Sequence, residues 1–300
     1  MKLVRYSTNG QSPRLGLLQG DRIADVQSSL AATLARRGVV RAPEIAAALA
    51  PTSTRAFLEG GAAAQDAVAS ITEWVTVPAN SARLHAPIAD PGKFICIGLN
   101  YSDHAAETNN PIPKEPPIFA KWNNAIIDPG EPILRPRGSK QLDWEVELGV
   151  VIGKPTRYVS KEQALDHVWG YTIINDASAR DFQFLTTQWM AGKIFETAAP
   201  VGPYIADRAE VPDPHVLTLK TFVNGKQVQN GSTKTFIFDV RYLVSYLSGL
   251  MTLMPGDLIA TGTPPGVGLG MKPPVFMNPG DTVRMEITGL GALENPVKDA

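Results

Sequence analysis

The segment at residues 142–153, Leu-Asp-Trp-Glu-Val-Glu-Leu-Gly-Val-Val-Ile-Gly, constrains the fold most, because it sets two carboxylates into an apolar, strand-like stretch. Successive side chains of a strand point to opposite faces, so Glu145 and Glu147 should lie side by side on one face. Two adjacent like charges on a hydrophobic strand are costly unless a positive group compensates them, and a bound cation is the most direct compensator. The alternative is an edge strand with a solvated acidic face.

The composition is that of an ordinary globular protein, with 44% hydrophobic and 19% charged residues among 300, enough for one large core or two unequal ones. A net charge of −1 gives no electrostatic footprint for nucleic acid or an anionic membrane, so neither is expected as a partner. The single cysteine, Cys96, lies in an apolar run, which predicts a buried thiol and excludes a disulfide framework. No segment has the length and apolarity of a signal peptide or a membrane span, so we expect a cytoplasmic protein.

The chain divides into two regions that differ in local composition. Up to residue 75, strand-like segments precede Ala-rich helices, which predicts a small N-terminal α/β domain. Residues 76–92 read as a Pro-punctuated linker, and residues 93–300 are β-rich with Pro and Gly at short intervals. The expected fold class is therefore α+β and β-rich. In the first region the expected strands are 2–6, 14–18 and 22–26, and the expected helices are 30–37, 43–50 and 62–74.

A histidine and a glutamate follow the expected strand at residues 94–99. Ser102 or Asp103 can cap a short helix, which would place His104 and Glu107 at positions i and i+3 on one face. A carboxylate bound to an imidazole fixes its tautomer and raises its basicity, as a general base acting on water requires. The alternative is a helical ion pair on the surface, which contributes little to stability.

A third carboxylate, Asp176, follows the expected strand at residues 171–174. Three carboxylates without a nearby Cys or His pair describe an oxygen-ligand site, which selects a hard divalent cation such as Mg²⁺ or Mn²⁺, with Ca²⁺ as a further option. The alternative for Asp176 is a cap of a helix that starts at Ala177. Lys193 lies beside Gly192 among apolar residues, so it either faces the acidic site or is a surface lysine.

The glycine-rich segment at residues 255–270 invites a nucleotide-binding interpretation. It contains no Gly-Lys-Ser/Thr and no helix follows a Gly-x-Gly-x-x-Gly pattern, so the P-loop and dinucleotide-binding motifs are excluded. A bend from strand to loop that supplies backbone N–H groups and Thr263 to a pocket fits better. Elsewhere, Asn224-Gly225 predicts a type I′ hairpin turn, and residues 240–250 predict an amphipathic helix.

Four motifs in this order give the chain a resemblance to the fumarylacetoacetate hydrolase family over about residues 93–296. In this sequence they are Gly98-Leu99-Asn100-Tyr101-Ser102-Asp103-His104, Asp143-Trp144-Glu145-Val146-Glu147-Leu148, Asn175-Asp176-Ala177-Ser178-Ala179-Arg180-Asp181 and Thr261-Gly262-Thr263-Pro264-Pro265-Gly266-Val267-Gly268. The resemblance implies a mixed β-roll around the metal, a small N-terminal appended domain, a catalytic domain at residues 93–300 and a homodimer. One departure is Glu196, where many members carry Asp.

The resemblance also implies a role for each matching residue. The metal ligands would be Glu145, Glu147 and Asp176. The catalytic residues would be His104, Glu107 and Lys193. The residues that hold substrate would be Arg180, Gln183 and Thr263.

The residues and the resemblance together predict a divalent-metal-dependent hydrolase that cleaves the C–C bond of a 2,4-dioxo acid of the acylpyruvate type. His104 would activate water to attack the 4-oxo carbon, and the C3–C4 bond would break to give a pyruvate enolate that the cation and Lys193 stabilise. The same site could serve oxaloacetate decarboxylation or tautomerisation, or isomerisation or hydration of an oxo-dienoate. A non-catalytic scaffold is a remote alternative. For the pocket around the acyl group, the expected wall residues are Trp122, Phe184, Trp189 and Met190.

Overall fold

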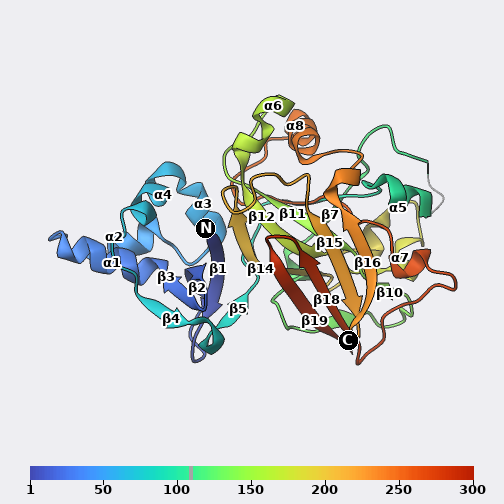
Figure 1. The fold of residues 1–300 in the computed structure, drawn as a ribbon, viewed down its shortest axis with the longest axis horizontal. Helices are drawn as coiled ribbons and strands as arrows, with labels where there is room; N and C mark the ends of the chain where they lie inside the picture. Colours follow the sequence, from blue (N-terminus) through green and yellow to red (C-terminus); the bar gives the residue numbers. More distant parts are fainter. Residues whose placement is uncertain (108–110) are drawn as a thin grey trace.

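The computed structural model describes residues 1–107 and 111–300, with the backbone alone at residues 104–106. A large, mostly antiparallel sheet runs through the molecule (Figure 1). In spatial order its strands are β4 (Thr76–Pro78), β3 (Arg22–Asp25), β2 (Arg14–Gln19), β1 (Lys2–Ser7), β14 (Ala199–Asp207), β12 (Val168–Asn175), β11 (Val146–Ile152), β17 (Leu258–Ala260), β6 (Phe94–Ile97) and β7 (Ile118–Lys121). Off this path, β5 (Arg83–His85) pairs with β1, and β8 (Ile126–Ile127) pairs with β14.

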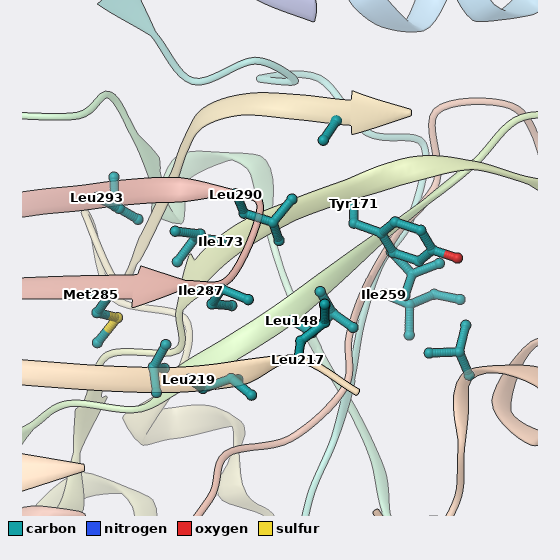
Figure 2. Close-up of a cluster of buried hydrophobic side chains, with 14 of the residues drawn as sticks. Leu148, Tyr171, Ile173, Leu217, Leu219, Ile259, Met285, Ile287, Leu290 and Leu293 are labelled. Atoms are coloured by element: carbon teal, nitrogen blue, oxygen red, sulfur yellow. The ribbon is translucent and has the colours of Figure 1, made fainter. Parts of the chain in front are cut away.

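A second sheet packs against the first. Its strands, in spatial order, are β16 (Lys226–Ser232), β15 (Thr218–Val223), β18 (Thr282–Ile287), β19 (Gly291–Asp299) and β9 (Ile133–Arg135). Figure 2 shows the core between the two sheets, where Leu148 and Ile173 of the large sheet lie near Leu219, Met285 and Ile287 of the second. Because side chains alternate along β11, Leu148 enters this core while Val151 enters the core on the other face.

The helices gather in three places (Figure 1). Beside β1 to β3 lie α1 (Val26–Arg36), α2 (Ala42–Leu49), α3 (Thr54–Glu59) and α4 (Gly61–Ala69). Above the sheets, α6 (Lys161–Ala164) packs on α8 (Val240–Leu250). On the side away from α1 to α4 lie α5 (Ser102–Glu107) and α7 (Arg180–Gln183). Within the described residues, no helix combines the length and apolarity that crossing a membrane requires.

Short elements complete the described chain. The two-residue strands β10 (Leu142–Asp143) and β13 (Ser178–Ala179) pair with each other. The 3₁₀ turns are η1 (Ala79–Ser81), η2 (Asn123–Ala125), η3 (Leu165–His167), η4 (Trp189–Gly192), η5 (Thr233–Thr235) and η6 (Gly268–Gly270).

The predicted α+β, β-rich class is confirmed, and the described strands form open sheets without a closed barrel. The expected strands 2–6, 14–18 and 22–26 and the helix at 240–250 are present. The Asn224-Gly225 turn is confirmed as well, since both residues have positive φ angles, of 50° and 77°. Helix α3 was not predicted, because Pro51 and Gly60 leave only a short run between them. The helix expected at 62–74 ends at Ala69.

The large sheet crosses the predicted domain boundary. Strand β1 pairs with β2 on one side and with β14 on the other, where Leu3 lies opposite Ile205. The predicted linker at residues 76–92 contributes both β4 and β5 to the same sheet. The division into residues 1–75, 76–92 and 93–300 stays a prediction, because one hydrogen-bonded sheet connects these segments.

Candidate active site

A cavity of about 360 Å³ opens beside the N-terminal end of β11. Its polar lining contains most of the residues that the sequence assigned to metal, substrate or catalysis, namely Glu145, Glu147, Arg180, Gln183, Lys193 and Thr263. The rest of its wall is mainly apolar and includes Ile97, Leu99, Phe119, Phe184, Trp189, Val267 and Leu269. The cavity therefore combines charged groups with an apolar lining.

Three buried carboxylates meet at the polar wall. Glu147 lies in β11, Glu145 lies just before it, and Asp176 directly follows β12. Because Val146 pairs with Asn175 across the two strands, the three side chains converge, and each offers an oxygen within 4.8 Å of the others. The structure thus brings together the three carboxylates that the sequence singled out.

The strand that carries the glutamates is interrupted, so the continuous strand expected at residues 142–153 was wrong. Between β10 and β11, three successive backbone N–H groups donate to side chains instead of to a neighbouring strand, which ends the ladder. These bonds run from Trp144 to Asp143 Oδ1 (2.8 Å), from Glu145 to Asn175 Oδ1 (3.2 Å) and from Val146 to Gln229 Oε1 (3.1 Å). The interruption places Glu145 outside the regular strand, while its carboxylate stays beside that of Glu147.

Cationic side chains contact two of the three carboxylates. Lys193 Nζ lies 2.7 Å from Glu145 Oε2 and 2.8 Å from Asp176 Oδ2, so this lysine faces the acidic site. Arg180 Nη2 lies 2.7 Å from Glu145 Oε1, and Lys121 Nζ lies 2.7 Å from Asp176 Oδ1. Burial alone would lower the pKa of Lys193, but the charges of Asp176 and Glu145 raise it above its ordinary value. Lys193 is therefore an ammonium cation at neutral pH.

Glu147 differs from the other two carboxylates. Its Oε2 accepts a hydrogen bond of 2.8 Å from the Gly262 N–H, and no ion pair joins it to a cationic side chain in the described part of the chain. Burial, followed by the charges of Asp176 and Glu145, raises the pKa of Glu147 well above its ordinary value. Asp176 Oδ1 is also buried, and among the described residues Lys121 is its one cationic partner. Buried carboxylate oxygens with so few partners fit a hard divalent cation.

The glycine-rich segment reaches the expected catalytic helix. The Gly266 N–H donates to both carboxylate oxygens of Glu107, at 2.9 and 3.1 Å. Gly266 has a φ angle of +101°, and a Cβ atom there would lie 2.1 Å from the Val228 carbonyl oxygen. Helix α5 contains both His104 and Glu107, but the side chain of His104 lies outside the described residues. The His104–Glu107 dyad therefore stays a prediction.

All three residues assigned to substrate have structural partners in addition to their place at the cavity. Arg180 Nη1 donates to Gln183 Oε1 at 2.9 Å. The Thr263 hydroxyl donates to the Val146 carbonyl at 2.9 Å. These side chains are therefore held in fixed positions at the cavity wall, as recognition of a substrate requires.

Sequence reasoning missed the role of Asp143, although the residue stands inside a quoted motif. Its buried carboxylate accepts hydrogen bonds from the backbone N–H groups of Gly268 (2.7 Å) and Leu269 (3.0 Å) and from Arg180 Nε (2.8 Å). Asp143 thus ties the glycine-rich segment to the arginine of the site. The aspartate directly before Trp-Glu-Val-Glu was the available signal.

Gln229 and Lys121 were missed as well. The Gln229 amide accepts from Thr221 Oγ1 at 2.7 Å and donates to Thr263 Oγ1 and to the Pro264 carbonyl, both at 2.8 Å. It connects the second sheet to the cavity wall. A polar residue at the end of the apolar strand at 118–121 was the signal for Lys121, whereas nothing in the local sequence marks Gln229.

The expected walls of the acyl pocket are partly wrong. Phe184 and Trp189 do line the cavity. Trp122 and Met190 line a different, mainly apolar hollow beside β7. The difference arises because η4 turns Trp189 and Met190 to different sides. Cys96, expected as a buried thiol, is free and fully buried, and burial raises its pKa well above the ordinary value.

Comparison with known proteins adds relatives over the whole chain. A mitochondrial oxaloacetate tautomerase of Xenopus laevis is 43% identical over 304 residues, which cover 99% of this chain and 90% of the relative. The crystal structure of 2-hydroxyhepta-2,4-diene-1,7-dioate isomerase from Mycobacterium marinum matches with a TM-score of 0.75 and 33% identity, covering 100% of this chain and 98% of that one. Maleylpyruvate hydrolase from Sphingobium sp. SYK-6, in complex with manganese(II) and pyruvate, matches with a TM-score of 0.77 and 29% identity over all of both chains.

The family assignment rests on a match of its own. Residues 93–298 match the model described as the C-terminal domain of fumarylacetoacetate (FAA) hydrolase. This match covers more than half of the chain and all of the described cavity residues. Together with a relative of 43% identity over nearly the full length, it shows that the chain belongs to the fumarylacetoacetate hydrolase family.

Proposed function

We propose that this protein is a divalent-cation-dependent enzyme that cleaves the C3–C4 bond of a 2,4-dioxo acid of the acylpyruvate type. The observation that carries this proposal is the group of three buried carboxylates, of which Glu147 has no cationic partner among the described residues. Removing such a charge from water is costly unless a cation compensates it. The ammonium of Lys193 stands beside this group, where negative charge would develop on a bound 2-oxo acid.

In this proposal Glu145, Glu147 and Asp176 hold Mg²⁺ or Mn²⁺. When bound, the cation supplies Lewis-acid polarisation of the substrate's 2-oxo group. Lys193 stabilises the negative charge that develops on the enolate oxygen. Phe184 and Trp189 contact the acyl group at the apolar wall.

His104 and Glu107 act on water in the same proposal. His104, oriented by Glu107, takes a proton from water as its oxygen attacks the C4 carbonyl. The C3–C4 bond then breaks, its electron pair enters the enolate of pyruvate, and the acyl group leaves as a carboxylic acid. Protonation of the enolate at C3 then gives pyruvate. Arg180, Gln183 and Thr263 hold the substrate at the polar wall.

Tautomerisation of oxaloacetate is the second candidate function. The full-length relative from Xenopus laevis, at 43% identity, favours it. This reaction passes through the enolate of oxaloacetate and needs no attacking water, so it depends on the carboxylates and Lys193 but not on water activation by His104. Decarboxylation of oxaloacetate likewise needs no attacking water, and isomerisation or hydration of an oxo-dienoate also needs the cation and an enolate. We also propose a homodimer, as the family resemblance implies, and a reducing cytoplasm, which the unpaired Cys96 suits.

The test compares acetylpyruvate and oxaloacetate in parallel, with metal-stripped protein and with Mg²⁺ or Mn²⁺ restored. Metal-dependent loss of the diketone absorbance, with pyruvate formed in equal amount, is the expected result. Decay of enol absorbance in oxaloacetate without pyruvate would move the assignment to the tautomerase, and pyruvate formed from oxaloacetate alone would move it to the decarboxylase. Failure of the protein to bind either metal would overturn the proposal.

A further inference from the structure

Lys121 is a fully buried lysine at the end of β7. Its ammonium donates to three backbone carbonyls, those of Ala177 (3.2 Å), Lys193 (2.6 Å) and Ala198 (2.8 Å). These carbonyls belong to three separate segments, which follow β12, follow η4 and precede β14. One side chain therefore fixes the relative positions of three backbone segments that surround the acidic site.

The charge of Lys121 serves a second purpose. Nζ also lies 2.7 Å from Asp176 Oδ1, so the three protons of the ammonium serve this oxygen and three backbone carbonyls. No other cationic side chain among the described residues pairs with Asp176 Oδ1. Lys121 thus offsets the charge of Asp176 from one side, and a second lone pair of this oxygen is open to another cation.

We propose that Lys121 is a positioning residue for the divalent-cation site, which aligns Asp176 and the backbone of Lys193 and leaves one lone pair of the ligand oxygen available. This inference rests on the proposed function, since it needs the three carboxylates to bind a cation. It assigns Lys121 no contact with the substrate. Partners behind metal ligands typically change metal affinity by about 10- to 100-fold when they are removed.

The direction in which Lys121→Met changes the affinity for Mn²⁺ distinguishes a positioning role from a purely electrostatic one. Lys121 places a positive charge beside a cation site, and like charges repel. If charge were its only contribution, Lys121→Met would bind Mn²⁺ more tightly than the natural protein. If Lys121 positions the site, the same variant binds Mn²⁺ more weakly despite the removed repulsion.

The experiment measures the Mn²⁺ dissociation constant by isothermal titration calorimetry in the full-length natural protein, Lys121→Met and Lys93→Met. Lys93 also pairs with a buried aspartate, since its Nζ donates to Asp257 Oδ2 at 2.7 Å. Lys93→Met therefore controls for the loss of a lysine–aspartate ion pair that does not involve the acidic site. The expected result is a dissociation constant raised about 10- to 100-fold by Lys121→Met and unchanged by Lys93→Met.

Each outcome has one meaning. Absence of Mn²⁺ binding to the natural protein overturns the proposed function itself. Binding by the natural protein together with equal or tighter binding by Lys121→Met overturns the positioning role, as does an equal weakening by Lys93→Met. Should Lys121→Met fail to fold, Lys121→Arg carries the same test. A planar guanidinium keeps the charge but cannot reproduce three converging bonds from one nitrogen, so the positioning role again expects weaker binding.

Discussion

Glu147 is the residue whose environment most directly links the site to stability. Burial, then the charges of Asp176 and Glu145, raise its pKa well above the ordinary value. The folded, cation-free protein therefore binds this proton more tightly than the unfolded chain does. Since stability falls with rising pH wherever the folded state holds more protons, the contribution of Glu147 weakens as pH rises above the ordinary carboxyl range.

Glu147→Gln should remove this pH dependence, because the amide has a similar shape and does not titrate. In EDTA, the free energy of unfolding of the natural protein should fall more between about pH 5 and about pH 8 than that of the variant. Urea denaturation at both pH values measures the difference, and titrating groups outside the acidic site contribute equally to both proteins. Parallel pH profiles would contradict the assigned environment of Glu147.

At the residue scale, local sequence predicted which carboxylates lie together but not which side chains hold them in place. The Glu-x-Glu spacing and the strand end at Asp176 suffice for three converging carboxylates, because adjacent strands bring their neighbouring residues together. Lys121 reads locally as the polar end of an ordinary strand. Its acceptors at Ala177 and Ala198 are far away in the sequence, so only the assembled fold identifies its role.

At the scale of elements, the interruption between β10 and β11 shows where the alternation of apolar and acidic residues gives a wrong prediction of strand length. The pattern of residues 142–153 continues through the interruption, so the sequence predicts one strand. Gln229, 83 residues away, captures the Val146 N–H and ends the ladder. A side chain that competes for a backbone donor from so great a sequence distance leaves no local signal.

The glycine-rich segment yields a prediction at the same scale, because two of the chain's glycines form a matched pair. Gly266 and Gly280 have similar φ angles, +101° and +97°, but a Cβ atom at Gly266 meets the Val228 carbonyl while one at Gly280 meets nothing within 4 Å. Gly280→Ala should cost only the backbone strain, about 1–2 kcal/mol. Gly266→Ala should cost more and should also weaken the contact with Glu107, since the segment must shift.

Thermal unfolding and the turnover of 2-oxo acids measure the two effects. Gly280→Ala should lower the melting temperature slightly and leave turnover unchanged. Gly266→Ala should lower both, because the Gly266 N–H can no longer meet the carboxylate of Glu107. Equal effects of the two variants on stability and turnover would show that the close approach of Val228 has no consequence.

At the scale of the whole molecule, local composition and strand pairing suggest different domain organisations. Ala-rich helices before residue 75 and Pro-punctuated strands after residue 93 suggest two bodies. Composition, however, indicates which segments form helices or strands and does not indicate which strands pair. The pairing of β1 with both β2 and β14 makes the N-terminal strands one side of the sheet that holds the site. The relatives that match all of this chain are consistent with such a continuous unit.

Leu3 tests whether the two regions unfold together. It is 1% exposed, lies opposite Ile205 of β14 and belongs to the core that extends under both regions. Leu3→Ala should lower the free energy of unfolding by about 2–5 kcal/mol, as large-to-small changes in a core do. Because one sheet connects the regions, hydrogen exchange in urea should accelerate together in peptides from β2 and from β12. Val40→Ala is the control, since Val40 is 96% exposed and its truncation should change stability by less than about 0.5 kcal/mol. Faster exchange in β2 alone would identify the N-terminal region as an independent folding unit and would support the division into two domains that the sequence predicts.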